Sequence, residues 1–160
     1  MTPEDKVLLF QDLCSRLPYY PKCEMIDETR VVNNEKDPSY ISTLFPKHIE
    51  LFSYHNDFTI KPYLRPMSSM TEEEKSELLI HILGNKKATK YFQVMPDGSI
   101  DQSDSSIQEL SNFTLHWLNF DGINTSSYID WLNAHHFDCR GLIEKGLAIE
   151  VTKENNPYKV

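Results

Sequence analysis

The sequence has little of several features that mark particular classes of protein. Only 5 of its 160 residues are glycine and no short repeat is present, which excludes collagen-like and low-complexity chains. Its 3 cysteines form no CxxC pair, so we expect neither a disulfide framework nor a four-cysteine zinc site. Long hydrophobic runs are absent, and the acidic N-terminal segment lacks the basic start and apolar stretch of a secretory signal. These absences predict a cytoplasmic protein with reduced thiols.

Positive charge is scarce as well. The chain has 16 Lys and Arg residues against 24 Asp and Glu residues, a formal net charge of −8. Affinity for a phosphate backbone comes from clustered Lys and Arg side chains, so we do not expect nucleic acid to be a partner. Mimicry of nucleic acid by the acids is a weak hypothesis, because their one evident cluster, Glu72–Glu74, already serves a helix start.

The residues that are present predict one globular domain. Hydrophobic residues make up 39% of the chain, enough for a core in a protein of this length. At the N-terminus, Thr2 is a good helix cap and Pro3 suits the first helical position. Apolar residues then recur at spacings of three and four, which predicts one stripe packed on the core. The members of this stripe are Val7, Phe10, Leu13, Cys14 and Leu17.

Further helices are predicted at residues 71–84, 106–121 and 127–136. The first of these opens with a capping box, in which Thr71 and Glu74 satisfy each other's terminal amides, and ends at Gly84. Extended segments are predicted at residues 22–32, 49–54, 58–64, 91–95 and 147–151. We expect residues 49–54 and 58–64 to form a hairpin, with Pro62 at a sheet edge or a strand end because it lacks a ladder donor.

Together these elements predict an α+β fold. About four helices pack on a small, mostly antiparallel sheet in a single domain, residues 1–151. The polar C-terminal tail, residues 152–160, is expected to be loosely held.

The densest group of chemically reactive side chains lies around the end of the last predicted helix. His135, His136 and Asp138 are ligand types that zinc accepts, which suggests a divalent metal site. Adjacent residues of a regular helix point about 100° apart, so two neighbouring histidines do not readily face one ion. The alternative is a structural role at a helix C-terminus. A metal site would also need a distant ligand, for example His48, His55, His81 or His116.

Two other kinds of site are considered from the sequence. Cys139 next to Arg140 could be a stabilised thiolate, but catalytic partners are seldom neighbours in sequence, so the cysteines are expected to be core residues. Aromatic residues are abundant, and such residues are enriched at protein interfaces. The candidate interaction residues are Tyr63, Arg65, Trp131 and Arg140.

Two long motifs carry a resemblance: KPYLRPMSSMTEEE, residues 61–74, and DWLNAHHFDCRGLIEKGLA, residues 130–148. With DLCSRLP, residues 12–18, they resemble an uncharacterised family of short proteins from Bacteroides-type gut bacteria and their phages or other mobile elements. Members of that family often carry Tyr at the position of Cys139, which counts against a catalytic thiol. The family has no established activity, so the resemblance implies a cytoplasmic protein of phage or mobile-element type and transfers no site residue.

Two functions follow as hypotheses. The first is a non-enzymatic accessory protein that acts through protein–protein contacts and forms a small homo-oligomer, with no cofactor and no membrane. The second is a metal-dependent hydrolase or metal-binding protein that uses His135, His136 and Asp138.

Overall fold

The computed structural model describes residues 1–33, 35–84, 86, 92–102 and 125–159. These residues form two compact units. Unit 1 contains Met1–Pro66 and His136–Val160, and unit 2 contains Met67–His135. The described residues include four α-helices and a four-stranded, mostly antiparallel sheet, which confirms the predicted α+β class.

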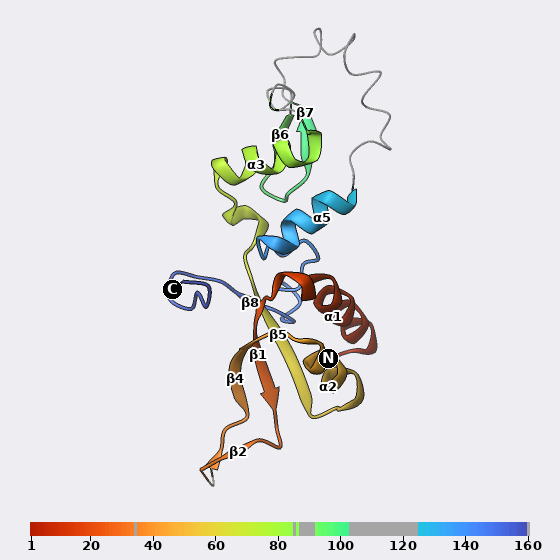
Figure 1. Ribbon diagram of the computed structural model, residues 1–160, viewed down its shortest axis with the longest axis vertical. Coiled ribbons are helices and arrows are strands. Elements are labelled where there is room, and N and C mark those ends of the chain that lie inside the picture. The colour runs from red at the N-terminus through yellow and green to blue at the C-terminus, as the bar shows by residue number, and fades with distance from the viewer. Residues whose placement is uncertain (34, 85, 87–91, 103–124, 160) are drawn as a thin grey trace. The chain divides into compact units, whose positions relative to one another are not determined.

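Unit 1 is built on the four-stranded sheet (Figure 1), whose strand order is β4-β1-β5-β8. Its strands are β1 (Lys22–Asp27), β4 (Ser39–Thr43), β5 (Phe58–Leu64) and β8 (Ile149–Glu150). Strand β1 pairs antiparallel with both β4 and β5, whereas β5 pairs parallel with β8. A small ribbon of β2 (Val31–Val32) and β3 (Glu35–Lys36) connects β1 to β4.

Helices α1 (Pro3–Arg16) and α2 (Pro46–Tyr54) cover one face of this sheet (Figure 1). The core beneath them contains Leu9 and Leu13 from α1, Phe52 from α2, and Met25 and Ile60 from the strands. Successive strand residues point to opposite faces, so the other face of β1, β4 and β5 carries the alternate residues. We call this second surface the open face.

The buried side of α1 agrees with the predicted stripe only in part: Leu13 is buried and Leu17 packs against the core, but the other three members do not. Val7 and Phe10 are 56% and 37% exposed, and Cys14 is exposed as well. The buried positions are Leu9, Asp12, Leu13 and Arg16. The prediction failed because Asp12 and Arg16 enter the interior as an ion pair, so the apolar pattern alone misplaced the buried side by more than a quarter turn.

The predicted strand at residues 49–54 is wrong, because these residues belong to helix α2. Pro46 occupies the first turn of α2, where its missing N–H costs nothing. His48 and Phe52, four residues apart, are buried on one side of the helix. The Nδ1 atom of His48 accepts a hydrogen bond from the Phe45 N–H (3.2 Å), which closes the start of the helix.

The expectation for Pro62 also needs correction, because β5 lies between β1 and β8. The Glu28 N–H donates to the Asp57 carbonyl (3.2 Å), which sets the alternation of bonded pairs between β1 and β5. Because bonded and non-bonded pairs alternate, Pro62 and Cys23 form a pair without backbone hydrogen bonds between β1 and β5. The backbone nitrogen of Pro62 therefore points toward β8. Strand β8 pairs only with Tyr63 and Leu64, and the missing donor therefore interrupts no ladder.

Unit 2 contains helices α3 (Glu72–Leu83) and α5 (Thr125–Ala134), the short helix η2 (Met67–Ser69), and a hairpin of β6 (Phe92–Val94) and β7 (Ile100–Gln102). The capping box of α3 is confirmed: the Glu74 N–H donates to Thr71 Oγ1 (3.2 Å), and the Thr71 N–H donates to the Glu74 carboxylate (2.9 Å). Gly84 ends α3 with a left-handed φ of 62°. The helix predicted at residues 106–121 lies outside the described residues.

The segment after β8 is tied to the sheet of unit 1 through Tyr158. Its hydroxyl accepts a hydrogen bond from the Lys22 N–H (3.1 Å) and donates one to the Tyr63 carbonyl (2.9 Å). The polar composition of residues 152–160 predicts a loosely held tail and does not reveal this anchor. Within the described ranges, no helix combines the length and apolar character needed to cross a membrane.

Candidate functional site

A buried ionic cluster joins α1 to the segment before β8 in unit 1. Asp12 and Arg16 have fully buried side chains, and the Arg16 Nε donates to a carboxylate oxygen of Asp12 (2.6 Å). The Arg16 Nη2 donates to the Phe137 carbonyl (2.8 Å). The Arg140 Nε lies 3.3 Å from the other oxygen of Asp12, with 30% of the Arg140 side chain exposed. The Asp12 carboxylate thus faces the guanidinium groups of Arg16 and Arg140. The Arg16 guanidinium also binds the backbone at Phe137.

Two cysteines lie within the electrostatic range of this cluster. Burial raises the pKa of the Cys23 thiol to about 12, although Arg16 acts in the opposite direction. Burial likewise raises the pKa of the Cys139 thiol. A raised pKa leaves little thiolate at neutral pH, so neither side chain has the character of an activated nucleophile. Cys14, predicted to be buried, is exposed on α1.

Asp138 holds the turn that follows the cluster. One of its carboxylate oxygens accepts the Leu142 N–H (2.9 Å), and the other accepts the Ile143 N–H (2.8 Å). The Asp138 N–H donates to the Arg65 carbonyl, and the Arg65 N–H donates to the His136 carbonyl, both at 2.8 Å. Asp138, predicted as a metal ligand, therefore uses both oxygens to order the backbone of its own turn.

The two predicted histidine ligands have different surroundings and belong to different units. In unit 2, the His135 ring stacks on Trp131 (centroids 3.8 Å apart), and its Nδ1 lies 2.8 Å from the Trp131 carbonyl. In unit 1, the His136 ring stacks on Tyr158 (4.2 Å), and His136 has a left-handed φ of 60°. Within the part of the chain that the structure describes, no three His, Cys, Asp or Glu side chains could together hold a metal ion. His116 lies outside that part.

The candidate interaction residues are mostly internal. Tyr63 is 8% exposed and Trp131 7% exposed. The Arg65 guanidinium lies over the Phe137 ring, 4.3 Å from its centroid, and Arg140 faces Asp12 as described. These four residues thus stabilise their own units, and the structure brings Tyr63, Arg65 and Arg140, but not Trp131, into unit 1.

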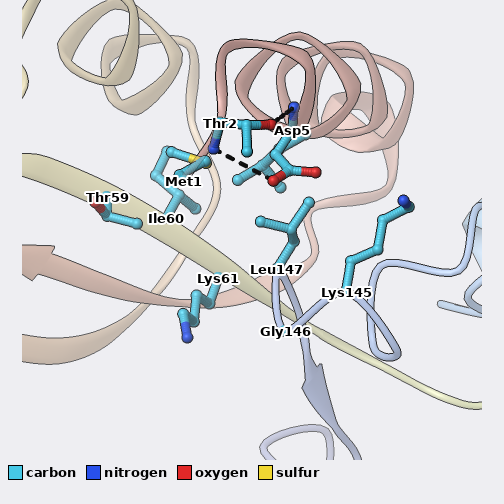
Figure 2. Close-up of a pocket in the computed structure, with 10 residues that line it drawn as sticks. Met1, Thr2, Asp5, Thr59, Ile60, Lys61, Lys145, Gly146 and Leu147 are labelled. Carbon is cyan, nitrogen blue, oxygen red and sulfur yellow. Dashed lines mark hydrogen bonds between the residues drawn. The ribbon is translucent and has the colours of Figure 1, made fainter.

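A pocket of about 430 Å³ opens between the start of α1, β5 and the turn before β8 (Figure 2). Leu9, Ile60 and Leu147 provide its apolar surface, and Asp5, Lys61 and Lys145 its charged groups. Hydrogen bonds from Thr2, which caps α1, are the main cause of a lowered pKa for Asp5. Figure 2 shows Lys61 pointing away from Asp5. The charged groups of this pocket thus include a carboxylate committed to the helix cap.

The large exposed apolar side chains of the described residues all lie within residues 1–54, in unit 1. One set is the α1 stripe, which we define as Val7, Phe10 and Cys14. A second set surrounds the edge strand β4: Ile41 is 57% exposed, Tyr20 62% and Phe45 42%. The rings of Tyr20 and Phe45 contact each other, with centroids 6.5 Å apart.

Sequence reasoning missed both of these surfaces. The α1 stripe was visible as a periodic pattern, but periodicity does not tell which of two helix sides is buried. The β4 strand carries no strong signal because its polar and apolar residues are mixed. Comparison with models of protein families, with curated proteins and with solved structures gives no match to this chain.

Proposed function

We propose that this protein is a non-enzymatic accessory protein that acts through protein–protein contacts made by unit 1. The observation that carries the proposal is the gathering of large exposed apolar side chains within residues 1–54. The resemblance of its motifs to short proteins of gut-bacterial phages and mobile elements gives the biological setting, a cytoplasmic accessory of such an element.

The α1 stripe supports this proposal. The helix is anchored on its other side by Leu9, Leu13 and the Asp12–Arg16 pair, which leaves its exposed apolar residues available to a partner. Apolar side chains that recur along one helix side form the kind of surface that partner proteins bind. An exposed phenylalanine such as Phe10 is well suited to fill a pocket of a partner.

The engagement of the reactive side chains agrees with a role in binding. Asp138 orders backbone amides, Arg16 fastens a carbonyl, and burial raises the pKa of Cys23 and Cys139. Asp138 and Arg16 thereby order the segment before β8. An ordered segment supports a binding surface because it lowers the entropy lost on association.

The test uses the full chain and one matched control. Phe10→Glu places a charge within the α1 stripe, whereas Asn56→Glu places the same charge in the exposed turn before β5, outside α1. We expect immobilised native protein to retain a protein from a lysate of a Bacteroides-type host, Asn56→Glu to retain it too, and Phe10→Glu to lose most of it. A chain that is monomeric by light scattering and retains nothing specific would contradict the proposal.

The metal-dependent function is the alternative proposal. It requires His135, His136 and Asp138 to meet around an ion, with the Asp138 oxygens already accepting the amides of Leu142 and Ile143. Elemental analysis of protein purified without chelator tests it. A stoichiometric divalent metal that is lost in His136→Ala would favour this alternative over a binding protein.

A further inference from the structure

Strand β4 is an edge strand whose own residues lack the usual protection against pairing with another chain, while the Arg30 guanidinium bonds the Ser39 carbonyl at one end of the edge. Its sequence, Ser-Tyr-Ile-Ser-Thr, contains no charge, proline or glycine, and its register with β1 continues through Lys22–Ile26 without a bulge. Natural proteins protect exposed edges with such charges, prolines or bulges, or by shortening the strand. The opposite edge strand, β8, is protected in the last way because it has two residues and includes Glu150.

The hydrogen-bond alternation shows which groups of β4 point outward. The Asp27 N–H donates to the Pro38 carbonyl (2.7 Å), and the Leu44 N–H donates to the Pro21 carbonyl (2.9 Å). These two pairs continue the β1–β4 register at its ends, and bonded pairs alternate along an antiparallel ladder. Tyr40 and Ser42 therefore turn their backbone groups toward β1. The three outward-facing residues are Ser39, Ile41 and Thr43.

We infer that β4 pairs antiparallel with β4 of a second copy of this chain, with Ile41 opposite Ile41 of that copy. This inference rests on the proposed function and names one partner for it. In this register Ser39 faces Thr43 of the other copy, so all three outward residues face outward residues and can exchange both backbone bonds. A shift by one residue would place outward groups against inward ones. A strand with an odd number of residues, centred on an outward residue, is thus complementary to itself.

Existing side-chain bonds leave room for this pairing. The Ser39 carbonyl accepts from the Arg30 Nη1 (3.3 Å), and the Thr43 carbonyl accepts from the Ser42 hydroxyl (3.2 Å). Each carbonyl has a second lone pair and can also accept a ladder bond. The contacts of Ser39 and Thr43 therefore do not exclude a partner strand.

The side chains favour a second copy over a charged partner. Ile41 is 57% exposed on the open face, and the pairing places it beside Ile41 of the other copy. Glu24, the neighbour of Ile41 on β1, lies between it and Lys61 of β5, so a cation flanks the acid that neighbours Ile41. The two Glu24 residues would be separated by three strand spacings, about 14 Å, beyond the Debye length in physiological salt.

The pairing is confined to the five residues of β4. Asp37, before the strand, is bonded to Arg30: its N–H donates to the Arg30 carbonyl (3.3 Å), and its carbonyl and carboxylate accept from the Arg30 Nη1 (3.0 Å each). After the strand, Pro46 begins helix α2. Residues Ser39–Thr43 therefore define the length of the proposed interface.

Disulfide trapping tests the register. In a Cys14→Ser background, Ile41→Cys places two thiols opposite each other, with Cα atoms about 5.5 Å apart, within disulfide range. Ser39→Cys is the matched control, because the two copies of residue 39 lie four residues apart along the strands, about 13 Å. We expect oxidation to give a covalent dimer with Ile41→Cys and little with Ser39→Cys. Equal cross-linking of both variants would overturn the register.

Light scattering over a range of protein concentration tests the dimer itself. We expect the native chain to dimerise. Ile41→Lys should raise the dissociation constant of the dimer at least tenfold, because two lysines would then face each other. Asn56→Lys, which adds the same charge in the exposed turn before β5, should leave the dimer intact. This inference is overturned if the native chain is monomeric and the Ile41→Cys variant forms no covalent dimer on oxidation. The proposed function would fail separately, if the immobilised native chain retained no specific protein in the capture experiment.

Discussion

Replacing Arg16 by Met should strongly destabilise unit 1. Arg16 is fully buried, bonds Asp12 at 2.6 Å and holds the Phe137 carbonyl at 2.8 Å. Met fills much of the volume of Arg16. It leaves the buried Asp12 carboxylate with only the Arg140 contact, and it leaves the Phe137 carbonyl without its donor. Breaking one partner of a buried ion pair costs about 3–5 kcal/mol. This is a large part of the roughly 5–15 kcal/mol that stabilises a typical domain.

Urea unfolding at neutral pH, followed by far-ultraviolet circular dichroism, measures this loss. Arg140→Met is the matched control, because Arg140 faces the same carboxylate at 3.3 Å but keeps 30% of its side chain exposed. Asp12 keeps its bond to Arg16 in this variant, so we expect a smaller loss of about 1 kcal/mol for Arg140→Met.

A double variant decides whether the pair acts as a unit. Asp12→Leu with Arg16→Met replaces the ion pair by apolar side chains and removes the unpaired charge that each single variant leaves. Such replacements are often neutral, so we expect the double variant to recover most of the stability lost in Arg16→Met. Losses that simply add, or an Arg16→Met loss below about 1 kcal/mol, would refute the reasoning.

Three further predictions concern single side chains. The free energy of unfolding should fall as the pH rises from about 9 toward about 12, because the Cys23 thiol ionises near 9.0 in the unfolded chain but near 12 when buried. Cys23→Ala should remove part of this decline in unfolding curves measured across that pH range. Gly98→Ala should destabilise unit 2 by about 1–3 kcal/mol, because Gly98 has a φ of 87°, which residues with a side chain rarely adopt. An unchanged melting temperature would contradict this. Asp138→Ala should cost about 1–3 kcal/mol, since it leaves the amides of Leu142 and Ile143 without their acceptor, and hydrogen exchange at those amides should accelerate.

Local signals in the sequence located several elements well. Thr2 with Pro3, and Thr71 with Glu74, mark the starts of α1 and α3, and Gly84 marks the end of α3. These predictions succeeded because a cap is a contact between residues three positions apart, which the sequence contains in full.

The errors have a common origin in contacts that the sequence does not contain. The buried side of α1 depends on Arg16 reaching Phe137, which is 121 residues away, so no local pattern could reveal that a charged side faces inward. The predicted strand at residues 49–54 became helix because Phe52 packs into the core beneath it, and a short apolar run is compatible with either structure. Trp131 and Tyr63 are aromatic, but only packing determines whether an aromatic side chain is buried or available.

The sequence by itself determined the α+β class, the caps of two helices and the absence of an evident catalytic motif. Those properties depend on composition, on short-range hydrogen bonds and on periodicity. The tertiary structure decided that α1 buries an ion pair and exposes its apolar stripe, and that β4 becomes the unprotected edge of the sheet. Burial and sheet order are set by which distant segments pack together, and the free energy of that packing belongs to no single segment.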